Sequence, residues 1–159
     1  MPAPPSSRRP VLVSACLMGR ECRYDGRSNR DLALEAQLEQ RGEAPVPFCP
    51  EEHGELGTPR PAAWIEGSGA SAVIDGSKRV LTEAGVDVTA AFLRGALGAL
   101  DVCQRFGIRR AYLKERSPSC GVCQTHAGGK LADGPGVTTA VLQREGIECL
   151  GVEGRRANS

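Results

Sequence analysis

The chain has 159 residues, with 20 Lys or Arg against 19 Asp or Glu, so its formal net charge is +1. This length suits a single domain with a core large enough to fold alone. The balanced charge gives no support for bulk attraction to long nucleic acid or to a membrane surface. No apolar run approaches the roughly 20 residues that a membrane-spanning helix needs.

The seven cysteines are the most informative feature of the composition. The first ten residues lack the apolar core of a signal peptide, so we expect a cytoplasmic protein with reduced thiols. An odd number of cysteines cannot pair completely in internal disulfides, which favours metal binding or catalysis for some of them. We expect a flexible tail over residues 1–10, one domain over residues 11–152 and a second tail over residues 153–159.

The predicted domain begins with a short apolar strand, Val11–Ser14, followed by a loop that contains two cysteines. A one-sided helix from about Arg30 to Gln40 comes next, with its N-cap expected at Ser28 or Asn29. A second strand, Val46–Phe48, leads into a long Pro- and Gly-rich stretch. A loop of this length in a compact domain is usually functional or disordered.

The middle of the chain contains a hairpin signal and a long helical pattern. Ala72–Ile74 and Lys78–Leu81 flank an Asp-Gly dipeptide, which is typical of a tight β-hairpin turn. A helix is predicted from about Thr89 to Phe106, and apolar residues at helical spacing place Cys103 on its core face.

The last third of the chain contains a strand at Ala111–Leu113, a glycine-rich loop over residues 114–136, a helix at about Val137–Arg144 and a strand at Ile147–Leu150. Cys149 lies inside that last strand, where we expect a core position. Strands and helices therefore alternate, which predicts an α/β fold with a three-layer sheet and a small β-hairpin insertion.

Three of the cysteines, Cys16, Cys49 and Cys120, each follow a predicted strand by a few residues. The carboxyl ends of parallel strands share one edge of the sheet, where ligands bind, so the three thiols could meet there. Three thiolates do not complete a closed four-ligand site. A [4Fe–4S] cluster on three cysteines would leave one iron free as a Lewis acid. Such an iron is thiophilic, so a sulfur-bearing substrate suits it.

Polar residues accompany these thiols on the same predicted loops. Glu51 follows Cys49 on a turn that proline stiffens, and its position beside a strand-end thiol makes its carboxylate a candidate for a role in the chemistry. Ser117 and Ser119 precede Cys120 in a turn whose hydroxyls and backbone N–H groups could cradle an anion or cluster sulfur.

Other readings of the cysteines remain open. Cys120, Cys123 and His126 have the spacing of half a zinc site, which would fit a zinc-binding or thiol-redox module. Cys22 lies six residues after Cys16 and could be a fourth ligand, a redox partner or a structural thiol. A non-catalytic iron–sulfur protein that binds a partner or senses redox state is a further alternative.

Six motifs in order carry a resemblance to a known family. They are Ser-Ala-Cys-Leu-Met-Gly at 14–19, Cys-Arg-Tyr-Asp-Gly at 22–26, Cys-Pro-Glu at 49–51, Thr-Pro-Arg-Pro at 58–61, Asp-Val-Thr at 87–89 and Lys-Glu-Arg-Ser-Pro-Ser-Cys-Gly at 114–121. The sequence from about Val11 to Val152 resembles the DUF523 family, which includes the thiouracil desulfidases. The resemblance implies a Rossmann-like domain with a mostly parallel sheet.

The resemblance also implies a [4Fe–4S] cluster on Cys16, Cys49 and Cys120, a catalytic carboxylate at Glu51 and a catalytic hydroxyl at Ser117. The sequence departs from the family pattern at residues 122–124, where a second cysteine stands, and this leaves open whether Cys123 replaces Cys120.

The sequence therefore predicts a cytoplasmic desulfidase that removes sulfur from a thiolated pyrimidine such as 2-thiouracil, giving uracil and sulfide by hydrolysis. Arg23, Asp25, Arg60 and Ser119 are the predicted substrate-binding residues. We expect a small thiolated base as the partner, no long nucleic acid and no membrane, and a monomer or weak homo-oligomer.

Overall fold

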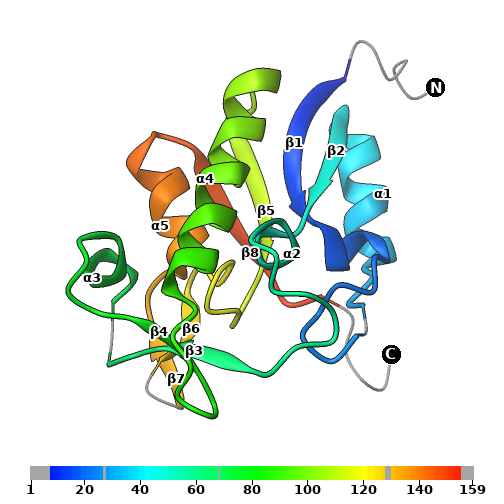
Figure 1. Ribbon diagram of the computed structural model, residues 1–159. Coiled ribbons are helices and arrows are strands. Elements are labelled where there is room, and N and C mark those ends of the chain that lie inside the picture. Colours follow the sequence, from blue (N-terminus) through cyan, green and yellow to red (C-terminus); the bar gives the residue numbers. More distant parts are fainter. Residues whose placement is uncertain (1–7, 27, 68, 128–129, 155–159) are drawn as a thin grey trace.

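Four parallel strands in the order β2-β1-β5-β8 form the central sheet of the computed structural model (Figure 1). The structure describes residues 8–26, 28–67, 69–127 and 130–154. The strands are β1 (Arg9–Ser14), β2 (Glu43–Phe48), β5 (Arg110–Lys114) and β8 (Glu148–Val152). Leu12 of β1 pairs with Val46 on one side and with Ala111 on the other. The predicted parallel α/β sheet is confirmed.

Helices cover both faces of this sheet, which gives the predicted three layers (Figure 1). On one face, Val11 and Val13 pack with Leu34 and Leu38 of α1 (Leu32–Gln40). On the other face lie α4 (Thr89–Phe106) and α5 (Val137–Arg144). Because both faces are covered, β1 reads in the sequence as a continuous apolar run rather than an alternating one.

Helices α4 and α5 have the predicted bounds, and Cys103 is buried against the sheet as expected. The predicted N-cap of α1 is wrong. Asp31 caps the helix, and its carboxylate accepts the N–H of Leu34 at 3.0 Å. Asn29 is held in the preceding loop instead, because its own N–H donates to the Cys16 carbonyl.

The strand order reverses at β1, which creates a crevice at the carboxyl edge of the sheet. The chain passes from β1 through α1 to β2 on one side, and later through α4 to β5 on the other side. Adjacent connections that leave in opposite directions open a space beyond the strand ends, which is the usual ligand site of such sheets.

A second four-stranded sheet, in the order β4-β3-β6-β7, lies beyond this edge (Figure 1). Its strands are β3 (Ala63–Ile65), β4 (Val80–Thr82), β6 (Gln124–Ala127) and β7 (Lys130–Asp133). The antiparallel pair β6–β7 lies within the stretch expected to be a glycine-rich loop.

The predicted hairpin at Ala72–Leu81 is wrong in its location. Ala70–Ile74 forms the short helix α3, whose Val73 packs into the core beside Ile65. The Asp-Gly dipeptide ends this helix, and β4 pairs with β3 rather than with the segment before the turn. Burial of one helical face has therefore overridden a local turn preference.

The boundaries of the predicted domain agree with the elements only in part. β1 begins at Arg9, within the expected tail 1–10, and the described chain continues past β8, where Glu153 pairs with Arg116. Residues 1–7 and 155–159 of the predicted tails lie outside the described residues. In the described part of the chain, no helix combines the length and apolarity needed to cross a membrane.

Candidate functional site

A cavity of about 370 Å³ lies at the carboxyl edge of the parallel sheet, between that edge and the second sheet. Its wall includes four thiols, those of Cys16, Cys22, Cys49 and Cys120. The three cysteines predicted to meet at the strand ends thus line one cavity. Cys22, whose role the spacing left open, lines it with them.

Each of the three strand-end thiols is positioned by the element that follows its strand. Cys16 lies in the 3₁₀ helix η2 (Ala15–Met18), directly after β1. Cys49 is the N-cap residue of α2 (Pro50–His53), directly after β2. Cys120 lies in the turn after β5, where Ser117 Oγ accepts the N–H groups of Ser119 and Cys120 at 3.1 and 3.0 Å.

Three of the cavity thiols, those of Cys22, Cys49 and Cys120, favour the protonated form. The hydrogen bond with the Cys16 thiol, together with burial, raises the pKa of Cys22 to about 12. The hydrogen bond with the Cys22 thiol and burial raise the pKa of Cys49. Burial raises the pKa of Cys120 to about 12. Thiolates form readily in such a place only when a cation compensates their charge, so metal binding would release protons here.

Close packing between α2 and α4 fixes where Cys49 and Glu51 stand. A Cβ added at Gly95 of α4 would overlap the Pro50 carbonyl and lie 2.7 Å from its carbon. A Cβ at Gly54, after α2, would lie 2.9 Å from the carbonyl carbon of Ala91. Two backbones can approach this closely only where no side chain separates them.

Glu51 and Arg60 form a buried ion pair in the cavity wall. Arg60 Nε donates to Glu51 Oε2 at 2.7 Å, and their side chains are only 6% and 16% exposed. Arg60 Nη2 also donates to the Cys22 carbonyl at 2.9 Å. Ser117 Oγ lies 3.4 Å from Glu51 Oε1. The predicted catalytic carboxylate and hydroxyl are therefore neighbours, and the arginine fixes the direction of the carboxylate.

Glu115 shapes the turn that carries Cys120, a role that the sequence did not reveal. Its buried carboxylate accepts the N–H groups of Val122, Cys123 and Gln124 at 2.9 to 3.2 Å. Burial acts to raise the pKa of Glu115, but these donors outweigh it and the pKa is lowered. Gly151 leaves room for this carboxylate, since a Cβ there would lie 2.6 Å from its carbon.

Three more polar side chains, those of Lys114, Arg23 and Asn29, line the cavity. Lys114 Nζ donates to the Glu115 carbonyl at 3.0 Å, and burial lowers the pKa of Lys114. Arg23 lies 3.5 Å from Asp25 and donates to Asn29 Oδ1 at 3.5 Å. The buried Nδ2 of Asn29 finds no partner among the described residues. Lys114 was noted only as part of the motif at 114–121 and Asn29 only as a possible helix N-cap, so neither was predicted to line the cavity.

Two predicted substrate-binding residues lie outside the cavity wall. Ser119 is fully buried, and its hydroxyl shares a hydrogen bond of 2.7 Å with Thr138 Oγ1. Asp25 contacts Arg23 rather than the cavity. Arg23 and Arg60 do line it.

The half zinc site suggested by spacing is not assembled. Cys120 is buried in the cavity wall, whereas Cys123 is exposed and outside it. His126 lines the cavity as well. Within the described ranges, the group of potential metal ligands that comes together is Cys22, Cys49 and Glu52, not Cys120, Cys123 and His126. Cys123 therefore lies outside the cavity that Cys120 lines. Cys149 is partly buried against the core.

A doubly covered parallel α/β sheet with a thiol-lined cavity at its switch point defines a Rossmann-like protein with a cysteine site. The family model described as 2-thiouracil desulfurase matches residues 11–153. The chain belongs to this family, and the predicted resemblance and desulfidase function are confirmed at that level.

Two known proteins are similar to this chain. The protein YbbK of Bacillus subtilis (strain 168), described as uncharacterized, is 36% identical over 143 residues, which cover 88% of this chain and 93% of YbbK. A solved structure of the [4Fe-4S]-dependent thiouracil desulfidase TudS (DUF523Vcz) is 43% identical, with a TM-score of 0.74. That match covers 91% of this chain and 91% of the other. The predicted fold class is confirmed by this likeness.

Proposed function

We propose that the chain uses a [4Fe–4S] cluster to remove sulfur from a thiolated pyrimidine, with 2-thiouracil as the representative substrate. The products are uracil and sulfide, and the reaction is a hydrolysis without an external electron donor. The observation that carries this proposal is the placement of three strand-end thiols and the Glu51–Arg60 pair around one cavity. The similarity to TudS, a [4Fe-4S]-dependent thiouracil desulfidase, supports the choice of cofactor.

Cys16, Cys49 and Cys120 would hold the cluster. Iron–sulfur clusters are bound chiefly by cysteine thiolates, and this cavity presents thiols from three separate strand ends. The donor set therefore fits the group. When bound through three cysteines, such a cluster supplies one iron as a Lewis acid with affinity for a thiocarbonyl sulfur. The cavity volume of about 370 Å³ lies within the range of small-molecule pockets.

Glu51 accepts the proton of the attacking water. Arg60 keeps the carboxylate turned into the cavity through its Nε contact at 2.7 Å, so Oε1 remains available on the side of Ser117. Ser117 donates a hydrogen bond to the carboxylate or to the substrate and can pass a proton between them. General base catalysis of this kind typically contributes 10²–10⁴-fold to the rate.

Arg23, which lines the cavity, is the proposed substrate contact. Its guanidinium and the amide of Asn29 lie in the same wall and offer N–H donors to an exocyclic oxygen of the base. Arg60 acts instead as a positioning residue for Glu51. The proposed protein acts in the cytoplasm as a monomer or weak homo-oligomer. Its proposed substrate is a free base rather than long nucleic acid, which is consistent with a net charge of +1.

The test is sulfide release from 2-thiouracil by protein reconstituted with iron and sulfide without oxygen. Glu51→Gln keeps the shape of the side chain and removes the base, so we expect release to fall by about 10²–10⁴-fold with unchanged iron content. Glu55→Gln, an exposed carboxylate just past α2, is the matched control and should release sulfide at the normal rate.

Heavy-oxygen water separates hydrolysis from other routes, because a hydrolytic product carries the heavy oxygen in its new carbonyl. Normal turnover by Glu51→Gln would remove Glu51 from the mechanism. Uracil without the heavy label would remove water as the attacking group.

A further inference from the structure

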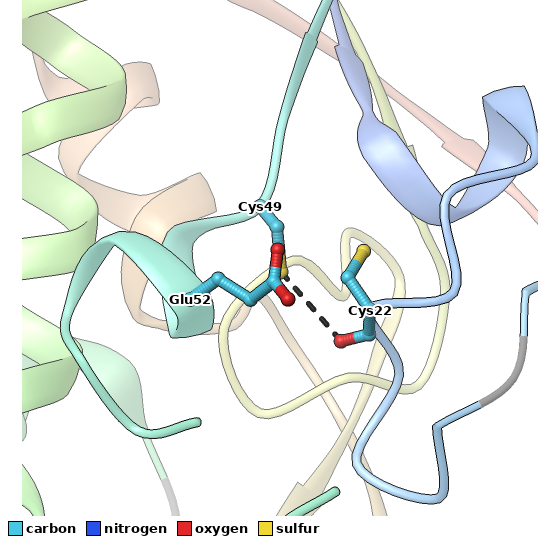
Figure 2. Close-up of side chains that lie close together, drawn as sticks. All are labelled: Cys22, Cys49 and Glu52. Carbon is cyan, nitrogen blue, oxygen red and sulfur yellow. Dashed lines mark hydrogen bonds between the residues drawn. The ribbon is translucent and has the colours of Figure 1, made fainter. Parts of the chain in front are cut away.

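Cys22, Cys49 and Glu52 form a compact group of metal-ligand atoms at one side of the cavity (Figure 2). One ligand atom of each lies within 4.8 Å of the other two. Cys49 is the N-cap residue of α2 and Glu52 lies within that helix, whereas Cys22 comes from the loop after η2. Two elements that are distant in the sequence thus bring two thiols and a carboxylate together.

The group is held in place by several contacts around it. Glu52 Oε1 accepts from Arg20 Nε and Oε2 accepts from Thr58 Oγ1, both at 2.8 Å. Cys49 Sγ donates to the Cys22 carbonyl at 3.8 Å, the contact drawn in Figure 2. Arg60 anchors the same carbonyl. Little rearrangement is therefore needed before a cation can bind.

The distance between the Cys22 and Cys49 sulfurs suits binding to one shared ion rather than to two different irons of a cluster. In a tetrahedral site with metal–sulfur bonds of about 2.3 Å, two thiolates lie about 3.8 Å apart. Thiolates on different irons of a cluster lie further apart, because an iron–iron edge separates their metals. Cys22 and Cys49, with their sulfurs within 4.8 Å, match the first arrangement.

We propose that Cys22, Cys49 and Glu52 bind a single zinc-like divalent cation in the cluster-free protein. The two thiols lose their protons to solvent as the cation binds, so the site carries two thiolates and one carboxylate. Three protein ligands leave a fourth position for water. The guanidinium groups of Arg20 and Arg60 offset the one negative charge in excess.

This cation site and the cluster site share Cys49. A cation bound through Cys22, Cys49 and Glu52 therefore withholds one of the three cluster ligands. Zinc-loaded protein must lose its zinc before a cluster can assemble, whereas zinc does not compete with an assembled cluster that already occupies Cys49.

Cobalt(II) titration of chelator-treated, reduced, cluster-free protein tests the proposal, because thiolate ligation produces an intense charge-transfer absorption. We expect one cobalt per chain, displaced by zinc. Loss of an outer-shell partner typically weakens metal binding by about 10–100-fold, so loss of a direct ligand in Cys22→Ser or Glu52→Gln should weaken cobalt binding by at least about 10-fold. Cys123→Ser is the matched control, since that thiol is exposed and outside the cavity, and should bind cobalt normally.

Cluster reconstitution of the same variants separates this proposal from the proposed function. Cys22→Ser should take up the same iron as the wild type, and zinc added beforehand should slow cluster assembly only in proteins that keep Cys22. Normal cobalt binding by both Cys22→Ser and Glu52→Gln would overturn the proposal. Loss of binding in Cys123→Ser would move the site to Cys123. Loss of cluster iron in Cys22→Ser would make Cys22 a cluster ligand.

Discussion

Replacing Gly95 by alanine tests whether α4 positions the helix that carries Cys49 and Glu51. A Cβ at this position would overlap the backbone carbonyl of Pro50. Overpacking of this kind costs about 1–3 kcal/mol, and a backbone obstacle places the cost near the upper end. Alanine in a helix interior returns about 1 kcal/mol relative to glycine. The net expectation is a loss of about 2 kcal/mol in the free energy of unfolding.

Gly98→Ala is the matched comparison on the same helix. Its Cβ would meet the imidazole ring of His53, an exposed side chain that can rotate away. The movement gives up a ring contact with Phe48, at a centroid distance of 5.1 Å, worth about 0.5–1 kcal/mol. The propensity gain of about 1 kcal/mol offsets this loss, so the net change should be near zero.

Urea unfolding of the two cluster-free variants measures the difference directly. In a thermal unfolding experiment, the same loss of about 2 kcal/mol should lower the melting temperature of a domain of this size by about 4–8 °C. Reconstituted Gly95→Ala should also release sulfide more slowly, because Pro50 lies between Cys49 and Glu51. Equal stability of Gly95→Ala and Gly98→Ala, with equal activity, would refute the claim that backbone contact between α2 and α4 sets the site.

Two further substitutions test the ion pair and the buried carboxylate. Arg60→Gln removes a charge-assisted hydrogen bond worth about 1.5–3 kcal/mol, so kcat for sulfide release should fall about 10- to 100-fold with iron content unchanged. Arg60→Lys keeps the positive charge and should restore part of the lost kcat. An unchanged kcat in Arg60→Gln would contradict the positioning role. Glu115→Gln should destabilise the protein by about 2 kcal/mol near neutral pH. Because the folded pKa of Glu115 is lowered, its contribution is complete above the ordinary value of about 4.3 and is lost as the pH falls through the folded pKa. Urea unfolding over a pH series should show the gap between Glu115→Gln and wild type closing below about pH 4, and a constant gap would argue against a charged role.

Local sequence signals were sufficient for elements whose burial is visible in their own residues. β1 and β5 are covered on both faces, so their apolar runs identify them directly. α4 ends at Gly107, which takes a left-handed conformation with φ of 64°, as the position after the helix requires. Two helices, α4 and α5, were therefore predicted with their observed bounds.

Local signals failed where distant partners decide the structure. β6 and β7 are short strands, and β3 pairs with β6 although their paired residues, Ile65 and Ala127, lie far apart in the sequence. α3 buries Val73 in the same core cluster as Ile65, an environment that no local pattern encodes. The roles of Glu115 and Asn29 likewise depend on neighbours that only the folded chain supplies.

By itself, the sequence determined the alternation of strands and helices and the position of three cysteines after strands. Those features follow from apolar periodicity and from turn residues that act over a few positions. Only the tertiary structure decided that Cys22 joins the cavity while Cys123 stays outside, and that Arg60 directs Glu51. These outcomes depend on how loops from separate strand ends pack against one another, and that packing is set by contacts between residues far apart in the chain.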